Sequence, residues 1–355
     1  QMVFAYRILP QYPEILAGVQ RRYRYFCVDE AQDTSKIQHA ILDLLAQESG
    51  NLFMVGDEDQ SIYGFRAAWP QALLEFEAHH PGAHILLMET NYRSTPAIVA
   101  GADAFIRRNQ SRRPKQMRTS RQGGGAIRRR ILEDYGAQSS YLLSVAREAA
   151  ERASTTAILF RNNDSALPLV DLLEREGIAY RYRQREGLFF SSPIVRDLTG
   201  MLRFSFRMED AAAFQSFYYK LDLKLKRTLV TRLLGRLAPG QTVFEALLES
   251  EELEPWQRSR VAAMQAHFSK LPQRSSFSAL MQLVRRMGYG EYLKAHYADI
   301  ARLDILLALA QQNAAPEDFL RRLDALRACT ARGGETDRCG GLTLSTIHAS
   351  KGLEY

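Results

Sequence analysis

Two adjacent carboxylates, Asp29 and Glu30, are the residues whose chemistry is most informative in this sequence. They follow the apolar run Tyr25–Val28, which predicts a short buried strand. In an open α/β sheet, ligands bind at the carboxyl ends of the strands. One carboxylate there can hold Mg²⁺ against phosphate oxygens, and its neighbour can accept a proton from an attacking water. The pair suits phosphoryl transfer from a nucleoside triphosphate, although a lone Asp-Glu pair is more often an exposed turn.

Three further segments follow in a definite order. An apolar run, Leu52–Val55, leads into the segment Gly56–Arg66, and a second run, Ile85–Met88, leads into Glu89–Ser94. The chain ends with the segment Thr346–Tyr355. Together with the Asp-Glu pair, these segments resemble the motifs of superfamily 1 DNA helicases of the UvrD/Rep/PcrA type, and the resemblance covers most of the chain.

The order of the expected elements defines the fold class. Strand and helix patterns alternate from Tyr23 to about Phe206, which predicts a mostly parallel sheet covered by helices. We expect strands at 23–28, 52–56, 84–88, 126–132, 155–160, 179–183 and 342–346. We expect helices at 36–47, 95–108, 139–152 and 165–176. From about 207 to 331 only helices are expected, at 209–220, 242–251, 255–269, 276–287 and 300–311.

The resemblance assigns this α/β chain to RecA-like P-loop NTPase domains with an all-helical insertion. It implies that residues 1–90 are the later part of a first RecA-like motor domain. Residues 91–206 and 336–355 then belong to a second RecA-like motor domain, which the helical accessory insertion 207–335 interrupts.

The resemblance also implies a site for ATP and Mg²⁺. Asp29 is the expected Mg²⁺ ligand, and Glu30 is the expected base for the hydrolytic water. Gln60 matches a glutamine that senses the γ-phosphate. The resemblance implies three further nucleotide contacts. Arg93 is the expected arginine finger, Tyr92 is expected to stack on the base, and Glu354 is expected near the ribose. A second reading of 91–96 is a helix start, with Ser94 as the cap and Pro96 in the first turn.

Single-stranded DNA is the partner that the resemblance implies for Tyr63, Phe65 and Arg66, because aromatic faces stack on unpaired bases. Without the resemblance, Tyr63 and Phe65 would be expected in the core. Many members of the family carry tryptophan where Phe65 stands and glycine where Ala67 stands. His348 and Lys351 match positions that contact the DNA backbone.

Basic residues are concentrated between Arg93 and Arg130, which hold eleven Lys and Arg against one acid, Asp103. A local excess of positive charge suits a phosphate backbone, although it can also be a solvated loop. The position of the run after the third segment favours nucleic acid contact, and we expect it from Arg112, Arg113 and Lys115.

Composition is that of an ordinary globular protein, with 46% hydrophobic and 25% charged residues and a net charge of +7. No apolar run is long enough for a membrane span, and the first residues do not resemble a signal peptide. Three dispersed cysteines do not form a disulfide framework or a zinc site, and Cys27 is expected in the core. A cytoplasmic protein with no membrane partner is expected.

The function that the resemblance implies is that of an ATP-dependent 3′ to 5′ DNA helicase and single-strand translocase. We expect it to act on single-stranded DNA and on single-strand/double-strand junctions, with proteins of repair, replication restart or recombination. The helicase portion of a helicase-nuclease is an alternative.

A phosphate-binding loop of the type Gly-x-x-x-x-Gly-Lys-Ser/Thr is not found in the sequence, which also ends before an arginine-containing block of the family. We therefore expect a fragment that does not hydrolyse ATP alone. Such a fragment could also serve as a non-catalytic module that binds nucleic acid.

Overall fold

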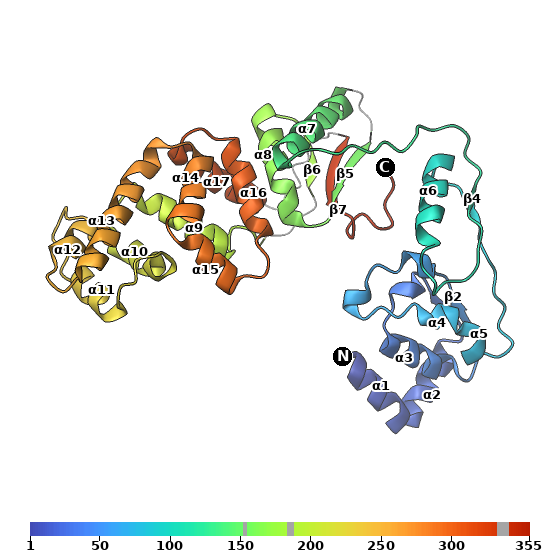
Figure 1. Cartoon of the computed structure of the whole chain (residues 1–355). Coiled ribbons are helices and arrows are strands. Elements are labelled where there is room, and N and C mark those ends of the chain that lie inside the picture. The colour runs from blue at the N-terminus through green and yellow to red at the C-terminus, as the bar shows by residue number, and fades with distance from the viewer. Residues whose placement is uncertain (152–154, 183–187, 332–340) are drawn as a thin grey trace. The chain divides into compact units, whose positions relative to one another are not determined.

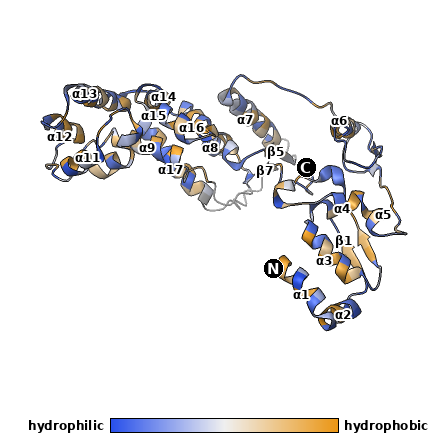
Figure 2. Ribbon diagram, turned by 60° about the horizontal axis from the view of Figure 1, so that its bottom comes forward, coloured by the Kyte–Doolittle hydropathy of each residue, from blue (hydrophilic) through white to orange (hydrophobic). Residues whose placement is uncertain are grey.

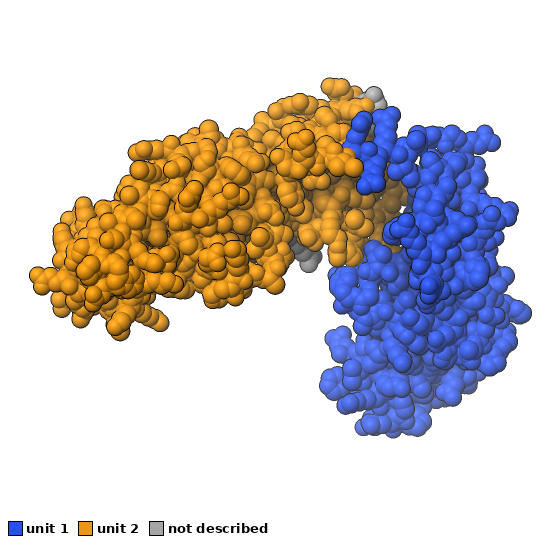
Figure 3. Space-filling view, in the orientation of Figure 1, with its two compact units in different colours: residues 1–130 blue, residues 131–355 orange. Residues whose placement is uncertain are grey.

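The computed structural model describes residues 1–151, 155–182, 188–331 and 341–355 (Figure 1). The chain forms two compact units, Gln1–Arg130 and Ile131–Tyr355 (Figure 3). Within the described residues, all strands of the named sheets pair in parallel. The prediction of an α/β chain with parallel sheets and many helices is therefore confirmed.

Unit 1 contains two small sheets. Strands β1 (Phe26–Val28) and β2 (Leu52–Met54) pair with Phe26 opposite Leu52, and β3 (Thr90–Asn91) pairs with β4 (Arg118–Thr119). Helix α3 (Lys36–Ala46) connects β1 to β2, and α1 (Met2–Gln11) and α2 (Pro13–Arg22) pack on it. Two short helices, α4 (Gln71–Leu74) and α5 (Phe76–His79), follow β2, and α6 (Pro96–Ile106) follows β3.

The prediction of a buried strand at 23–28 was wrong, because no residue of β1 is fully buried and Tyr23 and Tyr25 before it are exposed. Cys27 is exposed, and so is Phe53, which stands opposite it in the β1–β2 register. Figure 2 shows the apolar colouring of this sheet. The sheet has only two strands, and among the described residues no layer covers the face that carries Cys27. The expected core position of Cys27 is therefore corrected.

Two expected strands, at 84–88 and 126–132, are absent from the described residues. Residues 84–88 have no regular structure, and the strand begins only at Thr90. Residues 126–132 are also irregular. A strand needs a neighbour to accept its backbone hydrogen bonds, and β3 and β4 supply one to each other for only two residues. Apolar side chains outside that pairing stay in solvent, as Leu86 and Ile131 do, with 84% and 83% exposed.

Unit 2 is built around a three-stranded sheet with the order β5-β7-β6. Strand β7 (Leu342–Thr346) lies between β5 (Thr156–Phe160) and β6 (Arg181–Tyr182) although it comes last in the chain. Helices α7 (Tyr135–Glu151), α8 (Leu167–Glu176) and α9 (Pro193–Phe204) complete this part. Ile158, Leu173 and Leu344 belong to the shared hydrophobic core.

The described residues from 205 to 331 contain helices and no strand, as expected. Phe204 lies at their centre, with its ring centroid 5.2 Å from that of Phe268 and 5.3 Å from that of Phe217. Thr242 and Glu245 form a capping box at the start of α12, which fixes where that helix begins. The helices are α10 (Ala211–Phe217), α11 (Arg227–Leu234), α12 (Val243–Glu249), α13 (Pro255–Lys270), α14 (Ser276–Arg286), α15 (Tyr289–His296), α16 (Ala301–Gln311) and α17 (Pro316–Ala331).

The expected domain boundaries stay predictions. Packing divides the chain after Arg130, so β3, α6 and β4 belong to unit 1, although residues 91–130 were assigned to the second motor domain. The expected end of the insertion at 335 and Cys339 lie outside the described residues. Among the helices that are described, none combines the length and apolar character needed to cross a bilayer.

Candidate nucleotide and DNA site

The turn after β1 places Asp29 and Glu30 at the carboxyl end of that strand, with both side chains exposed. Glu30 adopts a left-handed backbone conformation, with φ of 51° and ψ of 39°, and its N–H donates to Asp29 Oδ1 at 2.8 Å. A left-handed conformation is uncommon outside glycine and costs on the order of 1–3 kcal/mol. Such strain collects at functional sites, which agrees with a functional rather than a merely structural turn.

Gln32 connects this turn to the segment after β2. Its side chain is 1% exposed; Nε2 donates to Glu30 Oε2 at 2.6 Å, and Oε1 accepts the N–H of Asp57 at 3.0 Å. The buried side-chain amide of Gln32 therefore joins Glu30, the expected base, to the segment Gly56–Arg66. Sequence reasoning missed Gln32, although its place two residues after Glu30 was a usable signal. Its contact with Asp57 could not be predicted from the sequence, because the two residues are 25 positions apart.

Gly56 allows the close approach on which this bridge depends. A Cβ at position 56 would lie 2.5 Å from Gln32 Oε1 and 2.7 Å from Leu73 Cδ1. Beyond the last paired strand residues, the Val55 N–H donates to Val28 O, and the Ala31 N–H donates to Val55 O. The two strand ends are therefore held together where the carboxylates begin.

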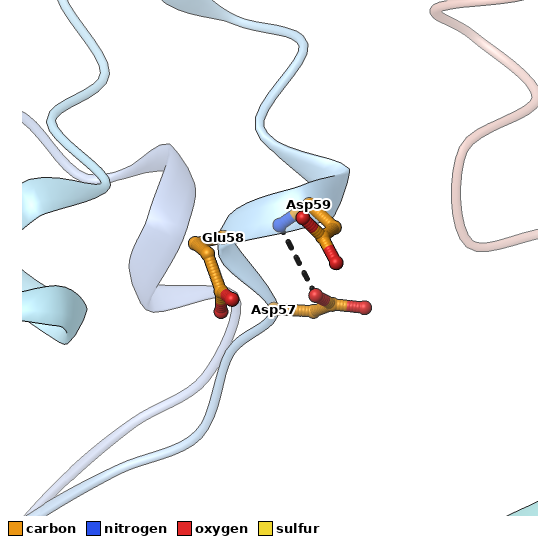
Figure 4. Close-up of side chains that lie close together, drawn as sticks. All are labelled: Asp57, Glu58 and Asp59. Atoms are coloured by element: carbon orange, nitrogen blue, oxygen red, sulfur yellow. Dashed lines mark hydrogen bonds between the residues drawn. The ribbon is translucent and has the colours of Figure 1, made fainter. Parts of the chain in front are cut away.

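The short helical turn Glu58–Gln60 brings together three carboxylates, Asp57, Glu58 and Asp59 (Figure 4). Asp57 caps the turn because its Oδ1 accepts the Asp59 N–H at 3.1 Å. Its Oδ2 accepts Gln60 Nε2 at 2.7 Å. Asp57 therefore has two roles. Its carboxylate holds the carboxamide of Gln60, the expected γ-phosphate sensor, and its backbone N–H donates to Gln32.

Two cations from the basic segment contact these three carboxylates. Arg112 forms a fork on Asp59, and Lys115 contacts all three acids. Burial acts to raise the pKa of Asp59, but hydrogen bonds from Arg112 and Lys115 outweigh it and lower that pKa. Burial acts to lower the pKa of Lys115, but its bond to Asp57 and its other acidic neighbours raise it. Because Arg112 and Lys115 already contact these carboxylates, we assign no metal ion to the acidic group.

Tyr63, Phe65 and Arg66 form the expected aromatic-basic cluster. The Tyr63 and Phe65 ring centroids are 6.0 Å apart, and the Arg66 guanidinium lies over both rings at 5.2 and 5.5 Å. Phe65 is 69% exposed, and Tyr63 is half-buried. The alternative that these aromatics belong to the core therefore does not hold for Phe65.

Tyr92 and Arg93 follow β3 in a tight turn. The Asn91 side-chain oxygen accepts the N–H of Arg93 at 2.9 Å and that of Ser94 at 2.7 Å. Thr95, rather than Ser94, is the N-cap residue of α6, and Pro96 occupies the first helical turn as expected. The correction follows from the Asn91 turn, which holds the backbone of Ser94 before the helix begins.

The remaining expected residues lie in unit 2, after β7. His348 Nδ1 is 3.4 Å from Nη1 of Arg161, so the two side chains meet at the carboxyl ends of β7 and β5. Lys351 is half-buried, and Glu354 is exposed. This is again the edge of a parallel sheet where ligands are expected.

Comparison with protein families accounts for nearly the whole chain. The model described as the UvrD/REP helicase N-terminal domain matches residues 2–81, and the model described as the UvrD-like helicase C-terminal domain matches residues 86–355. The chain belongs to the UvrD/REP helicase family.

Similar proteins agree with this assignment. The chain is 30% identical to YjcD of Bacillus subtilis (strain 168) over 364 residues, covering 99% of this chain and 47% of YjcD. It is 29% identical to the ATP-dependent DNA helicase PcrA of Leuconostoc citreum, covering 97% of this chain and 49% of that helicase. It is 25% identical to the ATP-dependent DNA helicase PcrA of Bacillus subtilis (strain 168), and the match covers 98% of this chain and 50% of that helicase. The chain spans about half the length of the curated relatives it matches.

The expected site residues of this UvrD/REP helicase chain fall into separate groups. Asp29, Glu30 and Gln60 lie on one hydrogen-bonded turn system, and the cluster Tyr63–Arg66 follows directly. Tyr92 and Arg93 also belong to unit 1, whereas His348, Lys351 and Glu354 belong to unit 2. The roles of all these residues stay predictions.

Proposed function

We propose that this chain is part of an ATP-dependent DNA helicase that moves 3′ to 5′ along single-stranded DNA. The observation that carries the proposal is the hydrogen-bonded path from Glu30 through Gln32 and Asp57 to Gln60. It connects the proposed base for ATP hydrolysis to the proposed γ-phosphate sensor through one buried amide. Membership of the UvrD/REP family and similarity to PcrA support the same reaction.

The exposed carboxylates at the end of β1 fit ATP and Mg²⁺. Carboxylate oxygens are the ligands that Mg²⁺ prefers, and Asp29 would hold the ion, which neutralises charge on the phosphates. Glu30 would accept a proton from the attacking water while Gln32 orients its carboxylate. Tyr92, Arg93 and Glu354 are proposed to contact the base, the γ-phosphate and the ribose, within RecA-like domains.

The cluster Tyr63–Arg66 is proposed to bind single-stranded DNA. An exposed phenylalanine presents a face on which any base can stack, and a neighbouring guanidinium adds attraction to phosphate. His348 and Lys351 are proposed to contact the backbone. Action at single-strand/double-strand junctions and roles with repair, replication restart or recombination proteins complete the proposal.

The matched test uses the complete helicase that we propose contains this chain. Glu30→Gln is expected to leave ATP binding largely intact and to reduce DNA-stimulated turnover by at least about a hundredfold, since a general base is lost. Glu48→Gln, an exposed substitution of the same kind, serves as the control. Near-normal turnover of Glu30→Gln would contradict the proposed role.

The isolated chain is proposed to bind DNA without hydrolysing ATP, because its 355 residues contain no Gly-x-x-x-x-Gly-Lys-Ser/Thr loop to hold the phosphates. Steady-state phosphate release with saturating single-stranded DNA and Mg²⁺ should stay at background. Turnover that disappears on Glu30→Gln would show that this loop is not required.

A further inference from the structure

The segment Arg112–Lys115 is attached to the turn that carries Gln60 by a dense set of ionic contacts. The Arg112 guanidinium donates to Asp59 through Nε at 3.0 Å and Nη2 at 2.7 Å. The two side chains are only 11% and 8% exposed. A bidentate, largely buried pair of this kind fixes direction as well as distance.

Lys115 completes the contact from the other end of the segment. Its Nζ reaches Asp57 Oδ1, Glu58 Oε1 at 3.2 Å and Asp59 Oδ2 at 3.1 Å, with the lysine side chain 10% exposed. Asp57 therefore accepts Lys115 on one oxygen and the Gln60 carboxamide on the other. The position of the Lys115 ammonium and the direction of the Gln60 side chain are linked through one carboxylate.

Arg113 anchors the same segment to neighbouring backbone. Its N–H donates to Glu58 Oε1 at 2.9 Å, and its Nη2 donates to the carbonyl oxygens of Leu73 and Leu74 at 3.0 and 3.1 Å. These carbonyls end α4, where a cation is favourable. All three basic side chains in this segment thus have acidic or carbonyl partners within unit 1.

We infer that Arg112 and Lys115 are positioning residues that hold the acidic turn so that the Gln60 carboxamide keeps a fixed direction. Without them, three adjacent carboxylates would repel one another and the turn would open. The inference rests on the proposed role of Gln60. It gives these cations a different task from the phosphate-backbone contacts expected from the sequence, because their charge is already matched inside the protein.

The first test measures hydrogen exchange of the Gln60 and Asp59 amides in this chain. Lys115→Met should speed exchange of both by at least about tenfold, because the Gln60 N–H donates to Asp57 O and the Asp59 N–H to Asp57 Oδ1. The matched control is Arg107→Met, which removes one positive charge from the same region and, among the described residues, breaks the ion pair with Asp103. Unchanged exchange in Lys115→Met would overturn the inference.

The second test separates positioning from DNA contact. If Lys115 only holds the turn, its substitution should alter the salt dependence of single-stranded DNA affinity no more than Arg107→Met does. A fall in the salt slope of about one, with Gln60 exchange unchanged, would mean that Lys115 contacts phosphate and would overturn the inference. Failure of the unaltered chain to bind DNA would contradict the proposed function, whereas the exchange result decides the inference by itself.

A third measurement uses the complete helicase and a conservative variant. Arg112→Met should lower the kcat of DNA-stimulated ATP hydrolysis at least about tenfold with little change in KM, if Gln60 acts on the γ-phosphate after binding. Arg112→Lys keeps the charge near Asp59 and should recover part of kcat. Equal losses for Arg112→Met and Arg107→Met would contradict a positioning role.

Discussion

The imidazole of His39 is hydrogen-bonded through Nε2 to the hydroxyl of Thr34, directly after the turn that carries Asp29 and Glu30. The Thr34 hydroxyl donates to Ala31 O at 2.7 Å, so its oxygen is left to accept the Nε2–H of His39. Nδ1 of His39 is buried without a partner among the described residues, and Trp69 packs edge-on at 5.9 Å. A proton on Nδ1 would be buried with no acceptor. The neutral ring is therefore the stable form.

Acid should weaken unit 1 through His39. Burial lowers the pKa of His39 below its usual value near 6.5, outweighing a backbone bond to Ala31 and the charge of Asp43, which raise it. A lowered pKa in the folded state gives stability that is complete above about pH 6.5 and is lost as pH falls towards the folded pKa. Thermal unfolding of His39→Gln, which keeps a donor near Nε2, should depend less on pH between 7.5 and 5.5. His84→Gln, at an exposed histidine, should keep the original dependence.

Gly56→Ala should destabilise unit 1 by about 1–3 kcal/mol, because the new methyl group would push Gln32 away from the Asp57 N–H. Gly18→Ala gives a control of opposite sign. Position 18 is within α2 with open space around it, so alanine should add about 0.5–1 kcal/mol. Urea unfolding of the chain measures both changes. Equal stabilities of the Gly56→Ala and unaltered chains would show that the close approach is not needed.

Phe65→Ala should weaken single-stranded DNA binding by about 1–3 kcal/mol for every base composition, since stacking does not read sequence. Phe65→Trp should at least retain affinity because it offers a larger face. Phe105→Ala removes a phenylalanine that is almost equally exposed, at 68%, but lies on α6. Fluorescence anisotropy with labelled oligonucleotides compares the three variants, and equal losses at 65 and 105 would indicate a nonspecific effect.

Arg93→Ala in the complete helicase should slow ATP hydrolysis by a factor on the order of 10³ with a much smaller effect on DNA affinity. The reason is the charge that a guanidinium neutralises on the γ-phosphate during transfer. Arg108→Ala, at an exposed arginine after α6, is the matched control. Comparable losses of hydrolysis and DNA binding in Arg93→Ala would make Arg93 a structural or DNA-binding residue instead.

The helices that local pattern predicted are close to those observed, although α1, α2, α9, α11, α15 and α17 were not among them. The expected helices 255–269 and 300–311 are observed as Pro255–Lys270 and Ala301–Gln311, because capping residues and apolar periodicity are local signals. The strands at 155–160 and 342–346 are also confirmed within one residue. The apolar run 84–88 failed as a strand, since strand formation depends on a partner that the run itself does not specify.

The candidate site was also predicted only in part from the sequence. The turn residues Asp29, Glu30 and Gln60 were identified from motif order, whereas the partners that hold them were not. Lys115 meets Asp57 across a sequence separation of 58 residues, and no local spacing predicts that contact. The basic character of 107–130 was visible, but charge alone does not distinguish an internal ion pair from a surface for phosphate.

The central place of β7 sets the order in which unit 2 can be completed during synthesis. Strands β5 and β6 leave the ribosome early, but the strand that joins them follows all of the helices α9 to α17. Neighbouring strands lie about 4.8 Å apart, so a gap one strand wide must stay open between β5 and β6 until Leu342–Thr346 arrives. The helices can form and pack first, because their contacts join residues that are nearer in sequence. The sheet that precedes His348 is therefore completed only after these helices have been made, by the strand Leu342–Thr346.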